Sequence, residues 1–191
     1  MSAPADPIEL FKEWFQLARA QEPDVPDAVA VATSASDGRP SVRMMLLKGV
    51  DADGFVLYTN FGSRKGAELA DNGQAALWKS LHRQVRVEGP VQRISDAQAD
   101  AYFESRDRES RIGAWASQQS RPVADRAALE ARFAECNERF GDGPVSRPPF
   151  WSGFRVQPER VEFWEERPAR LHDRFEYRRV DGQWARQLLQ P

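Results

Sequence analysis

The sequence predicts an α+β fold, mainly β, in which helices are inserted into and flank an antiparallel barrel. Short apolar or alternating segments recur along the chain, and tight-turn signals separate them at Asp37-Gly38, Asp53-Gly54 and Asp181-Gly182. Helical patterns interrupt the strands without alternating regularly with them. Because many short strands joined by tight turns favour antiparallel pairing and closure of the sheet, we expect a closed or nearly closed barrel.

Length and composition indicate a single enzyme-sized domain over residues 1–191, with a helix and linker over 1–26 and the barrel with its helices over 27–191. Charged residues make up 29% of the chain and the net charge is −2, without a continuous basic stripe, which argues against nucleic-acid binding. No apolar run is long enough to cross a bilayer. The single cysteine, Cys136, and the lack of a signal-peptide pattern favour a cytoplasmic protein without a cysteine-based metal site.

The first half of the chain alternates clear helix and strand signals. Asp6-Pro7 resembles an N-cap followed by a first-turn proline, and apolar residues recur after it at helical spacing. The elements expected here are a helix from residue 7 to about 20, strands over 28–33, 43–48 and 55–59, a helix from Ser63 to about Asn72, and a strand pair over 74–78 and 84–88 with a short basic connection, 79–83.

The second half begins with a capping box, Ser95 to Gln98, that predicts the start of a helix. Residues 122–140 form a second helical pattern closed by Gly141, and its apolar stripe of Leu129, Phe133 and Phe140 is expected in the core. Residues 112–120 show no strong periodicity. Strands are expected over 154–156, 161–164, 171–179 and from 184 onward.

The stretch from Arg43 to Lys65 carries the clearest functional signal. Arg64 and Lys65 fall in the first turn of the helix after Ser63, where free N–H groups make cations unfavourable unless an anion binds there. A phosphate would accept those N–H groups, the serine hydroxyl and both charges together. Two solvated surface cations remain the alternative on this stretch alone.

Eight motifs in a fixed order give the chain a resemblance to the pyridoxamine/pyridoxine 5'-phosphate oxidase family of flavin enzymes. They are RMMLLK (43–48), YTNFGSRK (58–65), RQV (83–85), YFESRDRESRIGAW (102–115), QS (119–120), FWSGFR (150–155), EFW (162–164) and RLHDRF (170–175). The resemblance covers the chain from about Asp6 to its last residue. It implies an FMN-binding split β-barrel that works as a homodimer with FMN at the subunit interface.

The resemblance also assigns roles to individual residues. Contacts to FMN fall on Arg43, Met44, Met45, Leu46, Leu47, Lys48, Tyr58, Thr59, Arg64, Lys65, Gln84, Gln119, Ser120, Trp164 and Arg174, to which the helix-start argument adds Ser63. Substrate contacts fall on Lys48, Tyr102, Arg106, Ser110, Arg170 and His172, and the last two are the expected catalytic residues. Arg170 and His172 stand two apart on an expected strand, which would point both side chains to one face.

The implied reaction oxidises pyridoxamine 5'-phosphate and pyridoxine 5'-phosphate to pyridoxal 5'-phosphate. Molecular oxygen is the electron acceptor and gives hydrogen peroxide, and the amine substrate also releases ammonia. The expected partners are therefore the phosphorylated vitamers, O₂ and a second copy of the chain, with no metal, nucleic acid or membrane.

Two departures from the family pattern keep other functions open. The chain has no Arg-x-x-Tyr segment before its first helix, and the stretch from Asn72 to Arg83 is shorter than the family pattern. If a strand is shortened by an odd number of residues, the side chains after the shortening, beginning with Gln84, turn to the opposite face of the sheet. The alternatives are a split-barrel flavin oxidoreductase with another substrate and a non-catalytic protein that binds FMN or pyridoxal phosphate.

Overall fold

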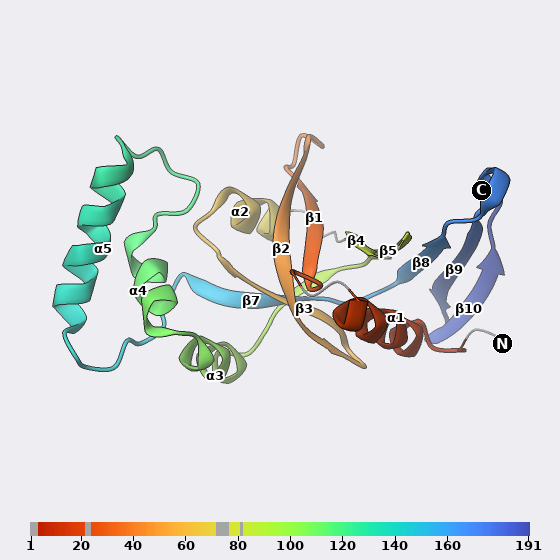
Figure 1. Ribbon diagram of the computed structural model, residues 1–191, viewed down its shortest axis with the longest axis horizontal. Helices are drawn as coiled ribbons and strands as arrows, with labels where there is room; N and C mark the ends of the chain where they lie inside the picture. The colour runs from red at the N-terminus through yellow and green to blue at the C-terminus, as the bar shows by residue number, and fades with distance from the viewer. Residues whose placement is uncertain (1–3, 22–23, 72–76, 81) are drawn as a thin grey trace.

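The computed structural model describes residues 4–21, 24–71, 77–80 and 82–191. Its helices and strands, drawn in Figure 1, are α1 (Pro7–Gln21), β1 (Ala28–Ser34), β2 (Pro40–Asp51), β3 (Gly54–Asn60), α2 (Arg64–Asp71), β4 (Leu77–Ser80), β5 (Arg83–Glu88), β6 (Val91–Arg93), α3 (Asp96–Ser105), α4 (Arg108–Ala116), α5 (Arg126–Phe140), β7 (Trp151–Val156), β8 (Arg160–Glu165), the 3₁₀ turn η1 (Pro168–Arg170), β9 (Asp173–Val180) and β10 (Gln183–Leu188). None of these described helices has the length and apolar character needed to cross a membrane.

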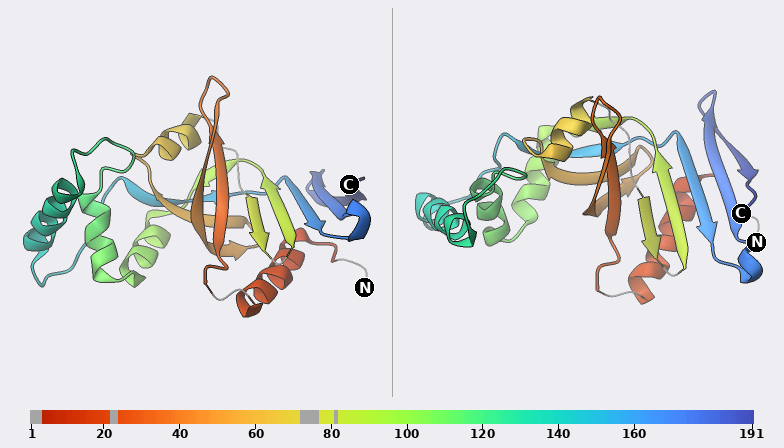
Figure 2. Two further views of the ribbon diagram at one scale, coloured as in Figure 1. Left: turned by 45° about the horizontal axis from the view of Figure 1, so that its top comes forward. Right: turned by 90° about the horizontal axis from the view of Figure 1, so that it is seen from above.

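The described strands pair in the order β10-β9-β8-β5-β4-β1-β2-β3-β7-β6, and every pairing is antiparallel. The helices α3, α4 and α5 lie at one end of the molecule, and β8 to β10 lie at the other, in all three views (Figures 1 and 2). The prediction of a mixed fold with an antiparallel sheet is therefore confirmed.

Two long chain segments lie side by side through the middle of this order. One segment is β5 followed by β6, and the other is β7 followed by β8. The two segments run antiparallel, so β5 pairs with β8 and β6 pairs with β7. Between the two ladders the pairing goes on, because Gln157 N–H donates to Pro90 O and Glu159 N–H donates to Glu88 O, each at 2.9 Å. The strands β7 and β6, which end the pairing order, are thus connected through the chain to β8 and β5 in its middle.

The main hydrophobic core draws on most of the strands that this junction connects. One cluster contains buried side chains from β1, β2, β3, β5, β7 and β8. The helix α1 covers it with its apolar face: the Phe11 ring meets Phe55 edge-on at 4.9 Å, and Trp14 meets Phe163 at 5.2 Å. Asp6 caps α1 by accepting a hydrogen bond from the Ile8 N–H group, as its position before Pro7 predicts.

Local capping signals predicted the helix starts well. Ser63 accepts a hydrogen bond from the Gly66 N–H group at the start of α2, and Ser95 accepts one from Gln98 N–H at the start of α3. The weak periodicity of residues 112–120 predicts no particular element, whereas in the structure residues 108–116 form α4. Asp107 begins that helix by accepting a hydrogen bond from the N–H group of Ser110.

The prediction that α5 packs into the core was wrong. None of its side chains is buried, and Phe133 and Phe140 only pack partly buried against a small second cluster around Phe103 and Trp151. The helix lies at the far end of the molecule, against α4 (Figure 1). Its apolar stripe is therefore half-covered within one chain.

Two strand predictions need correction. Residues 79, 80 and 83 belong to β4 and β5 instead of a connection; residues 74–76, expected in a strand, lie outside the described residues, as does part of the shortened stretch 72–83. Arg170 and His172 do not lie on a strand. Pro168 begins a 3₁₀ turn in which Ala169 and Arg170 both have positive φ angles, 57° and 60°, so β9 starts only at Asp173.

We expect Gly89→Ala to destabilise the fold, because a Cβ at this position would lie 1.9 Å from the Gln157 carbonyl oxygen at the junction of the two long segments. The backbone must move apart there, at a cost of about 1–3 kcal/mol in the free energy of unfolding. Denaturant titration measures this loss. The control is Gly113→Ala in α4, where a Cβ meets nothing within 4 Å and stability should rise by up to about 1 kcal/mol; equal stabilities of the two variants would contradict the account.

Candidate functional site

A cavity of about 1200 Å³ opens where β2, β3, the start of α2, α3 and α4 converge. Much of its lining was predicted from the sequence. The predicted site residues that line it are Arg43, Met44, Met45, Leu46, Lys48, Tyr58, Thr59, Arg64, Lys65, Tyr102, Arg106, Ser110, Gln119 and Ser120. Predicted site residues that lie up to 77 positions apart in the sequence therefore line the same cavity.

The start of α2 forms the cationic end of the cavity. Lys65 is 9% exposed, and its ammonium donates hydrogen bonds to Gln119 Oε1 at 2.8 Å and to Ser63 Oγ at 3.3 Å. Burial, and after it the charge of Arg43, lowers the pKa of Lys65. A buried ammonium beside another cation at a helix N-terminus is costly unless an anion shares the space. This end of the cavity is therefore suited to a phosphate.

A buried carboxylate holds the two arginines of this end in place. Glu68, 4% exposed, accepts hydrogen bonds from Arg64 Nε at 2.7 Å and from Arg43 Nη2 at 3.1 Å. The hydroxyls of Thr33 and Ser41 donate to the same carboxylate. Burial alone would raise the pKa of Glu68, but the hydroxyl and guanidinium donors outweigh it and lower the pKa to about 2.

Stacked aromatic rings form another wall of the cavity. Tyr58 and Tyr102 stack with ring centroids 3.8 Å apart, and Trp151 stacks on Tyr58 at 5.4 Å. The Arg106 guanidinium lies 5.0 Å from the centre of the Trp151 ring. This wall combines planar apolar surfaces with one cation.

Two polar atoms of the lining are buried without a hydrogen-bond partner among the described residues. They are Nη1 of Arg106 and Oγ1 of Thr59. Burial lowers the pKa of Arg106, so its charge is held at a cost. Unsatisfied buried donors are rare in folded proteins and indicate a missing partner. An anionic group beside Arg106 and a polar ligand atom beside Thr59 would satisfy them, and this supports a phosphorylated ligand and a polar cofactor in the cavity.

A second group of predicted site residues lies in register across three strands at the other end of the molecule. Gln84 of β5 pairs with Trp164 of β8, which pairs with Arg174 of β9. Their neighbours Val85 and Phe163 point into the core, so this outer row, Gln84–Trp164–Arg174, faces away from it. The three predicted cofactor residues therefore share one face despite the shortened stretch before Gln84.

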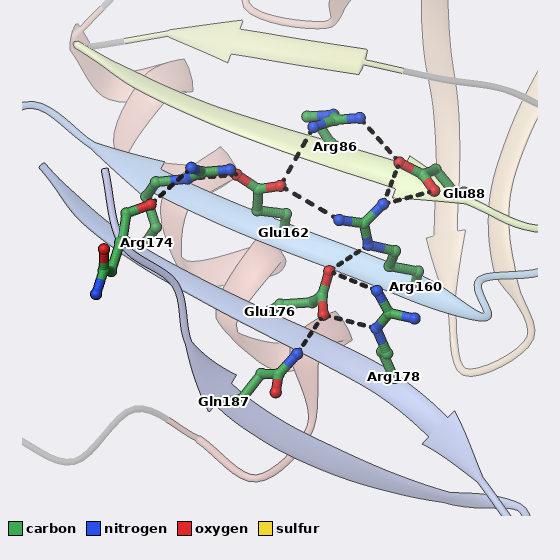
Figure 3. A network of polar contacts seen from close by, with 9 residues as sticks. Arg86, Glu88, Arg160, Glu162, Arg174, Glu176, Arg178 and Gln187 are labelled. Atoms are coloured by element: carbon green, nitrogen blue, oxygen red, sulfur yellow. Dashed lines mark hydrogen bonds and ion pairs between the residues drawn. The ribbon is translucent and has the colours of Figure 1, made fainter.

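Neighbours hold the outer row and the loop beside it. Arg174 donates from Nε and Nη2 to Oε1 of the buried Glu162, at 2.9 and 2.7 Å (Figure 3). The His172 ring lies 4.5 Å from the Trp164 ring, and its Nδ1 accepts a hydrogen bond from the backbone of Arg167. Arg170 is exposed on the 3₁₀ turn.

The structure does not bring the cavity and the outer row together within one chain. None of Gln84, Trp164, Arg170, His172 and Arg174 lines the cavity. β8 and β9, which carry Trp164 and Arg174, lie toward the end of the molecule opposite α3 and α4 (Figure 1). Two other predicted residues also lie off the cavity. Leu47 is in the main core, and Ser63 is buried behind Lys65.

One predicted substrate residue already has a partner. The Lys48 ammonium lines the cavity but forms an ion pair with Asp27 Oδ2 at 2.6 Å. A ligand that recruits Lys48 must share it with that carboxylate.

Sequence reasoning missed three residues that shape the site. Trp151 lies within a recognised motif without an assigned role, and neither Glu68 nor Asp107 is among the predicted site residues. Glu68 lies four residues after Arg64, a spacing that predicts an ion pair on a helix, and Asp107 lies three before Ser110, a spacing that predicts a cap. Both signals were present, whereas the approach of Arg43 to Glu68 depends on the fold.

Comparisons with known proteins agree over the whole chain. A family model described as Pyridoxamine 5'-phosphate oxidase matches residues 18–140, and one described as Pyridoxine 5'-phosphate oxidase C-terminal dimerisation region matches residues 151–191. A relative from Gluconobacter oxydans named Pyridoxine/pyridoxamine 5'-phosphate oxidase is 57% identical over 190 residues, 98% of this chain and 95% of its own. A relative of the same name from Rhodospirillum rubrum is 58% identical over 194 residues, 97% and 96% of the two chains.

Solved structures share the fold. PhzG from Burkholderia lata, crystallised with tetrahydrophenazine-1-carboxylic acid, superposes with a TM-score of 0.91 at 33% identity, covering 100% of this chain and 95% of its own. An FMN-binding protein from Nostoc punctiforme, related to pyridoxamine 5'-phosphate oxidase, has a TM-score of 0.76 at 18% identity, covering 99% and 100%. This second likeness concerns the fold alone.

We expect the contribution of Glu68 to stability to vanish in acid. Because its pKa is lowered from 4.5 to about 2 on folding, the ionised carboxylate stabilises the fold fully above pH 4.5, and the stabilisation is lost as the pH falls toward 2. Near neutral pH, Glu68→Gln should therefore lower the free energy of unfolding by at least about 1 kcal/mol. Urea titrations of both proteins between pH 7 and pH 2.5 measure the difference, which should shrink below pH 4.5; a difference independent of pH would contradict the assignment.

Proposed function

The chain belongs to the pyridoxamine 5'-phosphate oxidase family, and we propose here how its residues carry that activity. The reaction oxidises pyridoxine 5'-phosphate and pyridoxamine 5'-phosphate at C4′ to pyridoxal 5'-phosphate. The observation that best supports this function is one cavity with two separate cationic positions, Arg64-Lys65 at a helix start and Arg106 against the aromatic wall. An enzyme that binds FMN together with a phosphorylated substrate needs two such positions.

FMN is the proposed cofactor, and the cationic end of the cavity would hold its phosphate. Arg64, Lys65 and the free N–H groups of α2 offer charge-assisted hydrogen bonds, and Arg43 lies beside them. Thr59, with its unsatisfied hydroxyl, and Gln119, already bonded to Lys65, would contact the rest of the cofactor. When bound, FMN supplies the two-electron chemistry, with O₂ as the final acceptor and hydrogen peroxide as its product.

The substrate would lie against the aromatic wall, with its phosphate at Arg106. The unsatisfied Nη1 of Arg106 is a donor for a phosphate oxygen, and Ser110 on the first turn of α4 adds a hydroxyl to the cavity lining. Tyr102, already stacked on Tyr58, presents a ring beside which a pyridine ring can lie. The Lys48 ammonium, which forms an ion pair with Asp27, would also interact with the same phosphate.

We infer that a second copy of the chain completes each site. The family model for the dimerisation region matches residues 151–191. This segment contains Arg170, His172 and all of the outer row except Gln84. On β2, Val42, Met44 and Leu46 are exposed along the mouth of the cavity, 69%, 65% and 43%, and form an apolar strip that a partner would cover. A two-fold axis would then place each chain's outer row over the partner's cavity.

In that arrangement Arg170 and His172 would act on substrate bound to the partner. Because Nδ1 of His172 accepts a backbone hydrogen bond, the proton of the neutral ring lies on Nε2, which can donate to a ring substituent. Arg170 would orient the pyridine ring so that C4′ faces the flavin.

We also propose that the described sheet is the FMN-binding split barrel expected from the sequence, within one domain over residues 1–191. The junction of β5–β6 with β7–β8 supports this, since it joins β4, β1, β2 and β3 into a ring through the chain. One core built from the buried side chains of strands around the ring is the packing expected inside a small barrel.

Anaerobic mixing tests the proposed function directly. The FMN-loaded protein is mixed with pyridoxine 5'-phosphate, and the absorbance of the oxidised flavin ring, at about 450 nm, is followed. We expect bleaching, then recovery on admission of air together with formation of pyridoxal 5'-phosphate. Pyridoxine without its phosphate is the control and should bleach the flavin far more slowly.

Two outcomes would contradict the proposal. Flavin that stays oxidised with both phosphorylated vitamers would favour a binding protein or a different substrate. Failure to retain FMN would contradict the cofactor assignment itself.

A further inference from the structure

Glu68 is a buried carboxylate that lies behind the cavity and does not line it. It is 4% exposed, and both oxygens are occupied: Oε1 accepts from Arg64, and Oε2 accepts from Arg43, Thr33 and Ser41. Both of its arginine partners do line the cavity. Glu68 thus touches the proposed phosphate position only through other side chains.

Glu68 is a shared partner of the two arginines, and Arg43 is held in addition by the Val31 carbonyl oxygen and the hydroxyls of Thr33 and Ser41. Arg43 comes from β2 and Arg64 from the first turn of α2, and Arg64 is 62% exposed, so its side chain extends into solvent. A guanidinium pinned at Nε keeps its two Nη groups directed outward as a fork. Glu68 takes Nε of Arg64 and one Nη of Arg43, which leaves the remaining donors of Arg64 for a ligand.

Charge leads to the same conclusion. Arg43, Arg64 and Lys65 bring three positive charges together, and Glu68 brings one negative charge, which leaves two positive charges at this end of the cavity. A phosphate monoester at neutral pH carries a charge of about −1.5 to −2. Glu68 therefore balances the empty site without cancelling its attraction for such a group.

We propose that Glu68 is a positioning residue that sets Arg43 and Arg64 to receive the phosphate of the flavin cofactor. The proposal rests on the proposed function, since it assumes that this end of the cavity binds FMN. It predicts that Glu68 matters for FMN but not for riboflavin, which has the same ring system and no phosphate. A merely structural role would affect both flavins alike.

The chain offers a closely matched control in Glu176. This carboxylate is 1% exposed, its pKa is likewise lowered to about 2, and it accepts hydrogen bonds from Arg160, Arg178 and Gln187 (Figure 3). None of these three partners lines the cavity or belongs to the proposed site. Glu176 thus repeats the burial and the arginine contacts of Glu68 away from the phosphate position.

The experiment compares flavin affinities of the full-length apo-protein. FMN and riboflavin are titrated separately into the wild type, Glu68→Gln and Glu176→Gln, and binding is read from the quenching of flavin fluorescence. Melting temperature and oligomeric state are recorded for each protein. In Glu68→Gln, we expect FMN affinity to fall by about 10- to 100-fold, as for other residues that orient ligand-binding groups, and riboflavin affinity to stay within about threefold. Glu176→Gln should keep the wild-type ratio of the two affinities even if its melting temperature falls.

The outcomes separate the inference from the function on which it rests. An unchanged affinity ratio in Glu68→Gln, or tighter FMN binding as expected from simple removal of a negative charge, would overturn the positioning role. A wild type that binds the two flavins equally would overturn the proposed phosphate site as well. If Glu68→Gln does not fold, Glu68→Asp replaces it: the shorter side chain keeps the charge but cannot reach both arginines, and the same selective loss of FMN is expected.

Discussion

The structure depends on the contact between two long chain segments, β5–β6 and β7–β8, which pair from Arg83 opposite Glu165 to Arg93 opposite Phe154. Gly89 at their junction lies so close to the Gln157 carbonyl that no side chain fits between them. One end of β7–β8 carries Trp151 at the cavity, and the other carries Trp164 in the outer row. The pairing therefore joins the strands around the core and also holds the two halves of the proposed site apart, and this separation is the physical reason why we propose that a second chain completes the site.

Buried carboxylates organise arginines in both halves of the site. Glu68 holds Arg43 and Arg64 at the cavity, and Glu162 holds Arg174 in the outer row. In each case the carboxylate is nearly inaccessible and the arginine is more exposed. Such pairs contribute little net stability when both partners are buried, but they fix the direction of a guanidinium before a ligand arrives. Anion binding can then proceed with less loss of side-chain freedom.

Local chemistry made most of the elements and the cationic start of α2 predictable from the sequence, whereas the family resemblance supplied the rest of the predicted cavity lining. The Asp-Gly turns, the Ser63 and Ser95 caps and the apolar stripe of α1 act within a few residues. The errors arose where distant contacts decide. The turn after Pro168 needs positive φ angles at Ala169 and Arg170 that these side chains do not signal. The helix α5 is half-covered because it packs only partly buried against α4 and the small cluster around Phe103 and Trp151. Trp164 and the cavity could be assigned to one site, but their separation within one chain follows from the topology.

The most direct test of the two-chain site uses mixed dimers of Arg106→Ala and Arg170→Ala. Arg106 lines the cavity and Arg170 lies on the distant exposed turn, so each variant alone should lose most activity. The two chains are co-expressed with different tags and purified through both. If each site takes its cavity from one chain and its turn from the other, one of the two sites in every mixed dimer is intact, and about half of the wild-type activity returns. If both residues act within one chain, every site carries a substitution, and mixed dimers no more active than the two parent variants would contradict the account.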